Sequence, residues 1–363
     1  MVFSGSMRLA FVFVFLGLVS ADSLVAQCPV AGIESPAAVC IDQLFEISRP
    51  DIQSGEVSNW DLCAGDLTTP VTAQEVTTLA NISAPRGIVT VNSTDGIFSF
   101  IVGENNRFIR MHFASGLESA PTITNFQNIG NLLATPRGIT YVFENGNHYF
   151  IVANQAGSLV LINFENNLLG TPQVNLMQGL PSLSGVTNLK FLKFDNTNLL
   201  YAIGVGSGNR QIVVLDFGTS ILNTPQSSTL NFPTASGLSS LSLIQDCDQW
   251  YGLLASNINS RYYKLHFAED PRTLNSFEEF ADITAPLAAE LRWDSGNFYG
   301  FITTNSGSVI RLNFGSDFNT PGKISLTDLG SFSLLAQPRA FEIVNNGTLY
   351  YALAVGYADR KIT

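Results

Sequence analysis

The sequence predicts an all-β fold, a β-propeller built from four-stranded antiparallel blades. Three observations predict it. A sequence motif recurs about every 50 residues, and within each repeat Asn, Asp and Gly turns separate apolar strands. No helical period of apolar residues occurs near these strands. A phenylalanine closes one strand of each unit, and successive markers lie 51, 53, 50 and 47 residues apart: Phe113, Phe164, Phe217, Phe267 and Phe314. A period of this size indicates units that are each one small sheet and cannot bury their own faces alone.

Each unit reads as four short strands. The first is an apolar run such as 87–91, and an Asn/Asp/Gly turn with hairpin chemistry follows it, for instance residues 144–147. The second strand is rich in aromatic and β-branched residues, as in 298–302, and the third ends in the marker Phe. After a loop with a proline comes a fourth strand, such as 123–126. We place the blades near 71–121, 122–172, 173–225, 226–271 and 272–321.

The two chain ends complete the count. Residues 338–355 contain a first and a second strand, and residues 58–70 resemble a third strand with its proline loop. We therefore expect residues 58–67 to pair with 340–355 in a composite blade that closes a six-bladed ring and removes exposed sheet edges. The alternative is a fragment that ends within a blade, because residues 358–363 resemble the start of another third strand.

The N-terminus predicts secretion. Residues 1–26 combine a basic start, an apolar stretch at 9–19 and small residues at the exit, which is typical of a signal peptide cleaved after Ala21 or Ala26. A lipoprotein is the alternative, since Cys28 follows closely, although Gln27 stands where a small residue is usual. A non-repeat segment, 27–57, then precedes the propeller, 58–363. No later run of about 18 apolar residues occurs, so we expect no membrane span.

The composition and the cysteines narrow the possible partners and cofactors of the protein. Only 13% of residues are charged and the net charge is −11, which disfavours nucleic acid as a partner. The disulfide candidates are Cys28, Cys40 and Cys63, with Cys40 joined to either of the others, and Cys247 is expected to be free. Their spacing matches no zinc motif, and we expect neither a metal nor a cofactor.

Several segments resemble the secreted propeller modules of Bacteroidota-type surface proteins. The resemblance rests on residues 250–253 and 298–301, on the strand ends 215–218 and 312–315, and on residues 59–67, and it covers about residues 58–357. It implies a cell-surface or secreted location. Such modules commonly precede PKD-like adhesion domains and a C-terminal sorting domain, which this chain lacks, so it implies a part of a larger multidomain chain.

Histidines and acidic pairs predict structural roles. His112 and His266 occupy a repeat position that Asn or Asp holds in other blades, so we expect structural hydrogen bonds there, and we expect His148 to be solvated in a turn. The acidic pairs around 246–248, 269–270 and 278–279 read as surface turns, without a calcium-loop motif. No nucleophile elbow occurs, and we predict no catalytic residue.

Three arginines form the candidate site. Arg86, Arg137 and Arg339 each follow a proline at the start of a first strand, in blades that would be neighbours in a closed ring. First strands line a propeller axis, so the guanidinium groups would gather at one mouth of the channel, where they suit carboxylates, sulfates and uronates. The alternative is a structural clasp between adjoining blades.

The sequence favours a binding or adhesion module for an extracellular glycan or protein, with no chemistry of its own and monomeric. A propeller-fold enzyme acting on polysaccharide, as a lyase or glycosidase, is the first alternative, because fold alone does not decide function. A structural spacer of a larger surface protein is the second.

Overall fold

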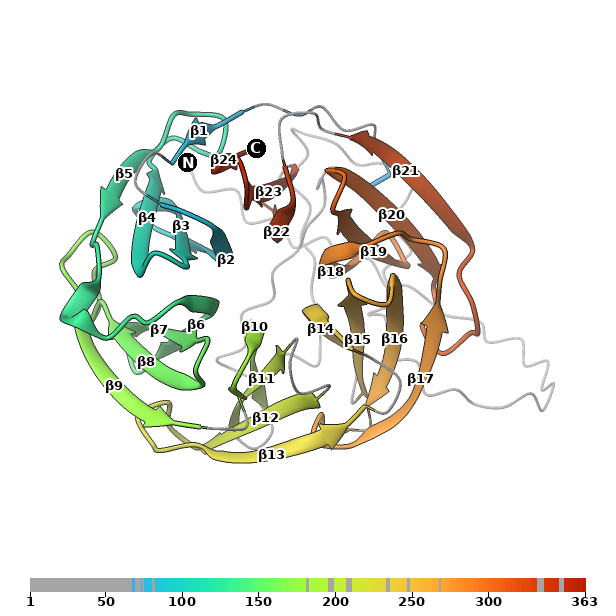
Figure 1. Ribbon diagram of the computed structural model, residues 1–363, viewed down its shortest axis with the longest axis horizontal. Helices are drawn as coiled ribbons and strands as arrows, with labels where there is room; N and C mark the ends of the chain where they lie inside the picture. The colour runs from blue at the N-terminus through green and yellow to red at the C-terminus, as the bar shows by residue number, and fades with distance from the viewer. Residues whose placement is uncertain are drawn as a thin grey trace, which may run out of the picture.

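The protein is a six-bladed β-propeller. The computed structural model describes residues 67–68, 73, 75–79 and 82–363, except 181–182, 195–198, 207–210, 233–235, 247–248, 268, 332–335 and 346–348. Six four-stranded antiparallel sheets are arranged around one axis, each with its first strand innermost (Figure 1). This confirms the predicted fold class. The segment predicted as a signal peptide, segment 27–57 and the cysteines Cys28, Cys40, Cys63 and Cys247 lie outside the described residues.

Each of the first five blades follows the chain from the axis to the rim. Blade 1 contains β2 (Pro85–Ser93), β3 (Gly96–Gly103), β4 (Arg107–Phe113) and β5 (Thr122–Asn125). Blade 2 contains β6 (Pro136–Glu144), β7 (Asn147–Asn154), β8 (Ser158–Asn163) and β9 (Gln173–Gly179). Blade 3 contains β10 (Val186–Phe194), β11 (Leu199–Gly206), β12 (Gln211–Gly218) and β13 (Gln226–Asn231). Blades 4 and 5 contain β14 (Leu238–Asp246), β15 (Gln249–Ser256), β16 (Arg261–Phe267) and β17 (Leu274–Phe280); β18 (Pro286–Asp294), β19 (Asn297–Thr304), β20 (Ser308–Gly315) and β21 (Ser325–Ser331). A 3-10 turn, η1 (Ile129–Asn131), lies between blades 1 and 2.

The fourth strand belongs to the blade before it. We predicted the fourth strand after the proline loop of the same unit, which the sheet order confirms, but the blade boundaries placed near residues 121, 172, 225, 271 and 321 cut each unit before that strand and were wrong. β5 pairs with β4, and β9 pairs with β8. The proline loop is thus a connection within one sheet, and the blade boundary falls after the outer strand.

The sixth blade is composite, as predicted, but its parts differ from the prediction. The C-terminus supplies β22 (Pro338–Asn345), β23 (Tyr350–Gly356) and β24 (Lys361–Ile362), and the N-terminal part adds β1 (Thr77–Thr78) at the rim. β1 pairs with β24 through Thr77–Ile362 and Thr78–Lys361. The expected partner was segment 58–67, of which only Leu67 is described, and it lies in a turn. β24, which lies within residues 358–363, is the third strand of the closing blade, between β23 and β1.

Burial explains why the second strands are uniformly apolar. They lie inside a blade with another blade on each side, so both of their faces are covered, and β3 and β19 are buried at every position after the first. The turn that precedes β7 has Asn145 at φ 50° and Gly146 at φ 79°. Two successive positive φ values are those of a type I′ hairpin turn, which confirms the turn predicted at 144–147.

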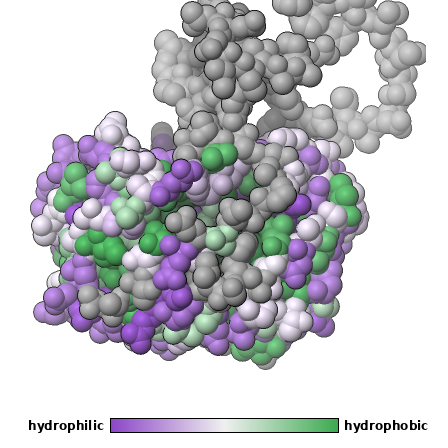
Figure 2. Space-filling model, turned by 90° about the horizontal axis from the view of Figure 1, so that it is seen from above, coloured by the Kyte–Doolittle hydropathy of each residue, from purple (hydrophilic) through white to green (hydrophobic). Residues whose placement is uncertain are grey.

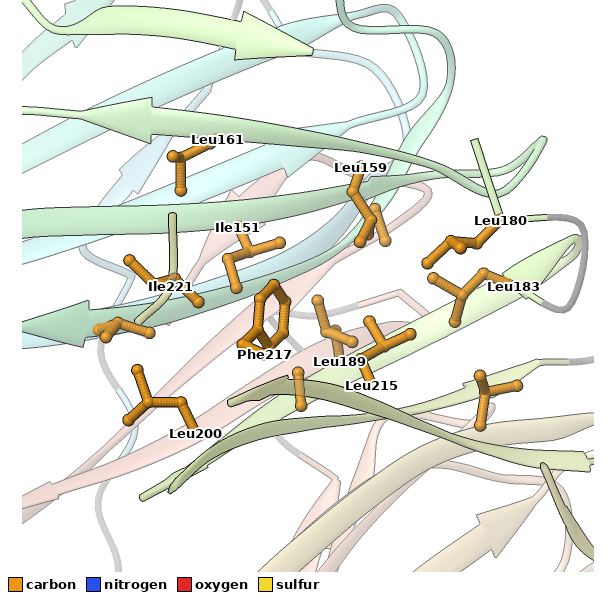
Figure 3. Packing of buried hydrophobic residues seen from close by; sticks show 14 of the residues in the cluster. Ile151, Leu159, Leu161, Leu180, Leu183, Leu189, Leu200, Leu215, Phe217 and Ile221 are labelled. Carbon is orange, nitrogen blue, oxygen red and sulfur yellow. The ribbon is translucent and has the colours of Figure 1, made fainter. Parts of the chain in front are cut away.

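The core consists of apolar layers between adjacent blades. Figure 3 shows the layer between blades 2 and 3, where Ile151 and Leu159 from one sheet face Leu215 and Phe217 from the other. All four side chains are buried. Since every sheet contributes both faces to such layers, a blade is stable only with neighbours on both sides.

Buried basic side chains tie neighbouring blades together. Lys264 in β16 is fully buried, and its Nζ donates a hydrogen bond of 2.6 Å to the Thr320 carbonyl in the next blade. Arg110 in β4 donates to the carbonyls of Leu168 and Gly170. Both residues stand three positions before a marker Phe, so the repeat places them alike. Arg311, at the same position in blade 5, donates to the Leu67 carbonyl at 2.8 Å and so holds the N-terminal part against the ring.

Polar and apolar side chains are interspersed on the side of the ring seen in Figure 2. Among the described residues, no helix is long and apolar enough to cross a membrane.

A candidate anion site at the mouth of the channel

The three predicted arginines converge on one cavity on the propeller axis. Arg86, Arg137 and Arg339 are the second residues of the inner strands β2, β6 and β22. The second residues of the other three inner strands line the same cavity, of about 70 Å³: Thr187, Ser239 and Leu287. Leu238 and Asn257 complete the lining. We call this cavity the vestibule. Every blade contributes to it, with cationic residues from three consecutive blades and neutral residues from the other three.

The backbone before each inner strand explains this convergence. In all six blades the preceding residue has a positive φ, and the arginine blades have Ala84 at 47°, Thr135 at 54° and Gln337 at 55°. The carbonyls of Ala84 and Gln337 accept the backbone N–H groups of Glu104 and Tyr357, at 3.2 and 3.1 Å. Through these hydrogen bonds Glu104 and Tyr357, each directly after a second strand, lie at the same mouth.

Glu104 joins two of the arginines. Its Oε1 accepts from Arg86 Nε at 2.7 Å and lies 3.0 Å from an Arg137 terminal nitrogen in the next blade. Its Oε2 accepts from the Tyr357 hydroxyl at 3.3 Å. The carboxylate therefore forms the interblade clasp that was the alternative interpretation of Arg86 and Arg137.

Arg339 has no such clasp. Its guanidinium lies over the Tyr357 ring at 4.6 Å from the centroid, and that of Arg86 lies 4.3 Å from the same centroid. Arg339 Nε is buried and has no hydrogen-bond partner among the described residues, and the same is true of Arg137 Nε. In the described part of the chain, three guanidinium groups share one carboxylate, which leaves the cluster with two excess positive charges.

The charges in the vestibule are poorly compensated. Burial lowers the pKa of Arg339, and the charge of Arg86 lowers it further. Burial and Arg86 likewise lower the pKa of Arg137, although Glu104 opposes them. Each lowered pKa means that the site disfavours the charged guanidinium, so a bound anion would relieve the cost.

An ion pair joins the inner strands of blades 3 and 5 below the vestibule. Lys190 and Glu290 are the fifth residues of inner strands in blades 3 and 5, and Lys190 Nζ lies 2.6 Å from Glu290 Oε1. Glu290 Oε2 accepts from Ser242 Oγ at 3.0 Å and lies 3.2 Å from Arg292. Burial would raise the pKa of Glu290, but Lys190 and Arg292 keep it below its usual value. Three residues along a strand span about 10 Å, so this network forms a floor under the arginines.

A second carboxyl group, Glu342, lies at the same level in β22. Its Oε2 is buried and has no hydrogen-bond partner among the described residues. Burial raises the pKa of Glu342 to about 7; Lys190 opposes the shift and Glu290 reinforces it. The floor therefore holds one ionised carboxylate and one carboxyl group that titrates near neutral pH.

The histidines lie away from the vestibule in structural contacts. His112 Nε2 lies 2.7 Å from the Asp95 carbonyl, and His266 Nδ1 lies 3.1 Å from Asn319 Oδ1, which confirms the expected hydrogen bonds. His148 was predicted in a turn, but it lies in β7, where it pairs with Phe143 of β6. Its Nδ1 lies 2.8 Å from the Tyr141 hydroxyl. Burial lowers the pKa of His148, because strand residues surround it. No group of three or more His, Cys, Asp or Glu side chains suited to a metal ion occurs among the described residues.

The sequence interpretation missed Glu104 and Tyr357. Both directly follow a second strand, as does Asn257, so a comparison of that repeat position across blades would have placed them at the same mouth. A strand-by-strand reading treats the position as an ordinary loop.

Fold and vestibule together define a six-bladed propeller with a cationic pocket on its axis. No family model matches the chain, and no curated protein resembles it in sequence. Among solved structures, a mutant of AofleA from Arthrobotrys oligospora with three arginines replaced by alanine has a TM-score of 0.53 at 8% identity, over 76% of this chain and 80% of that chain.

Two further structures show lower similarity. A chain of a nidogen/laminin complex has a TM-score of 0.46 at 12% identity, over 67% of this chain and 80% of that chain. An exo-β-1,3-galactanase from Phanerochaete chrysosporium with galactose has 0.47 at 11% identity, over 63% of this chain and 60% of that chain. At such identities the likeness concerns the fold alone.

Proposed function

We propose that the protein is an extracellular, non-enzymatic binding module whose vestibule holds an anionic glycan. The observation that carries the proposal is the convergence of Arg86, Arg137 and Arg339 on one cavity with a single carboxylate among the described residues around it. Guanidinium groups bind carboxylates and sulfates through paired N–H donors. The rest of the protein is acidic, with a net charge of −11, so this cluster differs in sign from its surroundings.

The neutral half of the lining supports a glycan rather than an acidic peptide. Thr187, Ser239 and Asn257 offer hydroxyl and amide groups opposite the arginines. These groups both donate and accept hydrogen bonds, as sugar hydroxyls require. Secretion, predicted from residues 1–26, would expose the module to such ligands.

Retention on immobilised acidic polysaccharide tests the proposal. We expect the native protein to be retained at low salt and released as salt is raised, since the Debye length falls to about 10 Å at 0.1 M. The triple variant Arg86→Ala, Arg137→Ala, Arg339→Ala should not be retained. Arg261→Ala is the matched control, because Arg261 pairs with Glu279 on the outer wall.

Two outcomes would contradict the proposal. If the native protein and the triple variant are retained equally, or if neither is retained while both are folded, the arginines are interblade clasps only. Selective retention on immobilised polyglutamate, with none on the polysaccharide, would indicate an acidic peptide as the ligand.

A further inference from the structure

Resting on the proposed function, we infer that the vestibule binds the single anionic group of a terminal sugar residue, end on along the axis, and that Arg339 determines specificity for it. The first observation is size. The cavity measures about 70 Å³. An accessible volume of about 10–15 Å³ holds one water molecule, so the space admits a small anionic group such as a carboxylate or a sulfate.

The second observation is that walls and floor surround this space. All six blades contribute lining residues, so the vestibule is a well around the axis and not a groove across the face. The Lys190–Glu290 pair, with Ser242, joins the inner strands of blades 3, 4 and 5 about 10 Å below it. Because walls surround the space and this network lies below it, the end of a glycan chain reaches the arginines more readily than the middle of a chain.

The third observation separates Arg339 from the other two arginines. Arg86 and Arg137 already pair with Glu104, whereas Arg339 pairs with no carboxylate among the described residues, and its Nε, like that of Arg137, is buried without a hydrogen-bond partner there. An incoming anion gains most free energy at a buried donor group that has no other hydrogen-bond acceptor. Tyr357 lies beneath both Arg339 and Arg86 and holds the former in place.

Glu104 then acts as a built-in competitor for the ligand. Its carboxylate occupies donors of Arg86 and Arg137 that a ligand carboxylate could use, and it cancels one of the three positive charges. The glutamine side chain in Glu104→Gln keeps an acceptor oxygen that can orient both arginines but removes this charge. We therefore expect the substitution to tighten anion binding.

Calorimetry with oligogalacturonates of one to six residues tests the inference at fixed ionic strength. We expect one ligand per protein and a Kd, per mole of chain, that changes less than about threefold with length, because one terminal residue makes the contacts. Arg339→Ala should weaken binding at least about tenfold, and Glu104→Gln should tighten it about threefold or more. Thermal unfolding of each variant shows whether it is folded.

The outcomes separate the inference from the proposed function. If the native protein binds no acidic saccharide, the proposed function itself fails. If it binds and the triple arginine variant does not, but affinity rises steeply with chain length, binding is along a surface and the end-on inference is wrong. Unchanged affinity in folded Arg339→Ala, or weaker binding in folded Glu104→Gln, would also overturn it.

Discussion

At the scale of single residues, Arg86 and Arg137 from neighbouring blades share the Glu104 carboxylate at the mouth of the channel. Arg86, Arg137 and Arg339 stand at one repeat position, so a closed ring brings them together. The partner Glu104 was not predicted, because it reaches the mouth from the end of a different strand. The ion pair below the arginines was not predicted either, since Lys190 and Glu290 come from blades 3 and 5, which are far apart in the sequence.

Glu342 provides a test at this scale. Its pKa of about 7 in the folded protein exceeds the usual 4.5, so the folded state binds more protons than the unfolded state between these pH values. Stability should therefore fall as pH rises from about 4.5 to 7 and should level off above 7. The groups that face it are Lys190, Glu290, Arg292 and Thr90.

The substitution Glu342→Gln removes this titration while keeping the shape. We expect the variant to be more stable than the native protein at pH 8, by up to about 3 kcal/mol, and to lose this advantage at pH 5. Melting temperatures of both proteins between pH 5 and 8 measure the difference. Parallel curves would show that Glu342 is ionised throughout the range or that its charge is compensated.

At the scale of elements, strand identity follows from local sequence and blade assignment does not. Aromatic and β-branched runs with Asn-Gly turns identify β6 and β7, because turn chemistry and burial act within a few residues. Whether a fourth strand such as β5 joins the sheet before or after it depends on hydrogen bonds across the proline loop. The repeat period is the same in both cases, so it did not fix the blade boundary, although the predicted order of four strands within a unit was right.

The buried lysine of β16 tests how elements are held together. Lys264→Met keeps the apolar stem but removes the donor to the Thr320 carbonyl, which lies in the loop after β20. Since Lys264 is buried and its hydrogen bond is charge-assisted, we expect a loss of about 1–3 kcal/mol in the free energy of unfolding. Urea unfolding measures it.

Arg261→Ala, in the same strand, is the control. Arg261 is over one-third exposed and pairs with Glu279, so its loss should change stability by less than about 1 kcal/mol. Equal effects for the two variants would mean that Lys264 does not tie blades 4 and 5 together.

At the scale of the whole molecule, the ring closes because C-terminal and N-terminal strands together form the sixth blade. The prediction of a composite blade holds because an open ring would leave a sheet edge and an apolar layer exposed. The position of β1 was not predictable, since Thr77–Thr78 is a pair of residues without a strand pattern of its own. Its neighbours Leu79 and Ile82 anchor it in the apolar layer between the closing blade and blade 1.

Leu79→Ala tests whether this closing seam belongs to the cooperative core. Leu79 is 2% exposed, so its truncation should cost about 2–5 kcal/mol, as for a buried leucine elsewhere. Leu241→Ala, in the layer between blades 3 and 4, is the matched comparison. A melting temperature unchanged by Leu79→Ala but lowered by Leu241→Ala would show that the ring is stable without the N-terminal part.

The central claim is that the vestibule is an anion site, and a crystal structure with selenate tests it most directly. Selenate has the shape and charge of sulfate, and the anomalous scattering of its selenium atom distinguishes the ion from bound water. We predict a selenate ion in the vestibule within hydrogen-bonding distance of Arg339 Nε, absent from crystals of Arg339→Ala. A vestibule that holds only water, or a carboxylate of the chain itself bound to Arg339, would contradict the account.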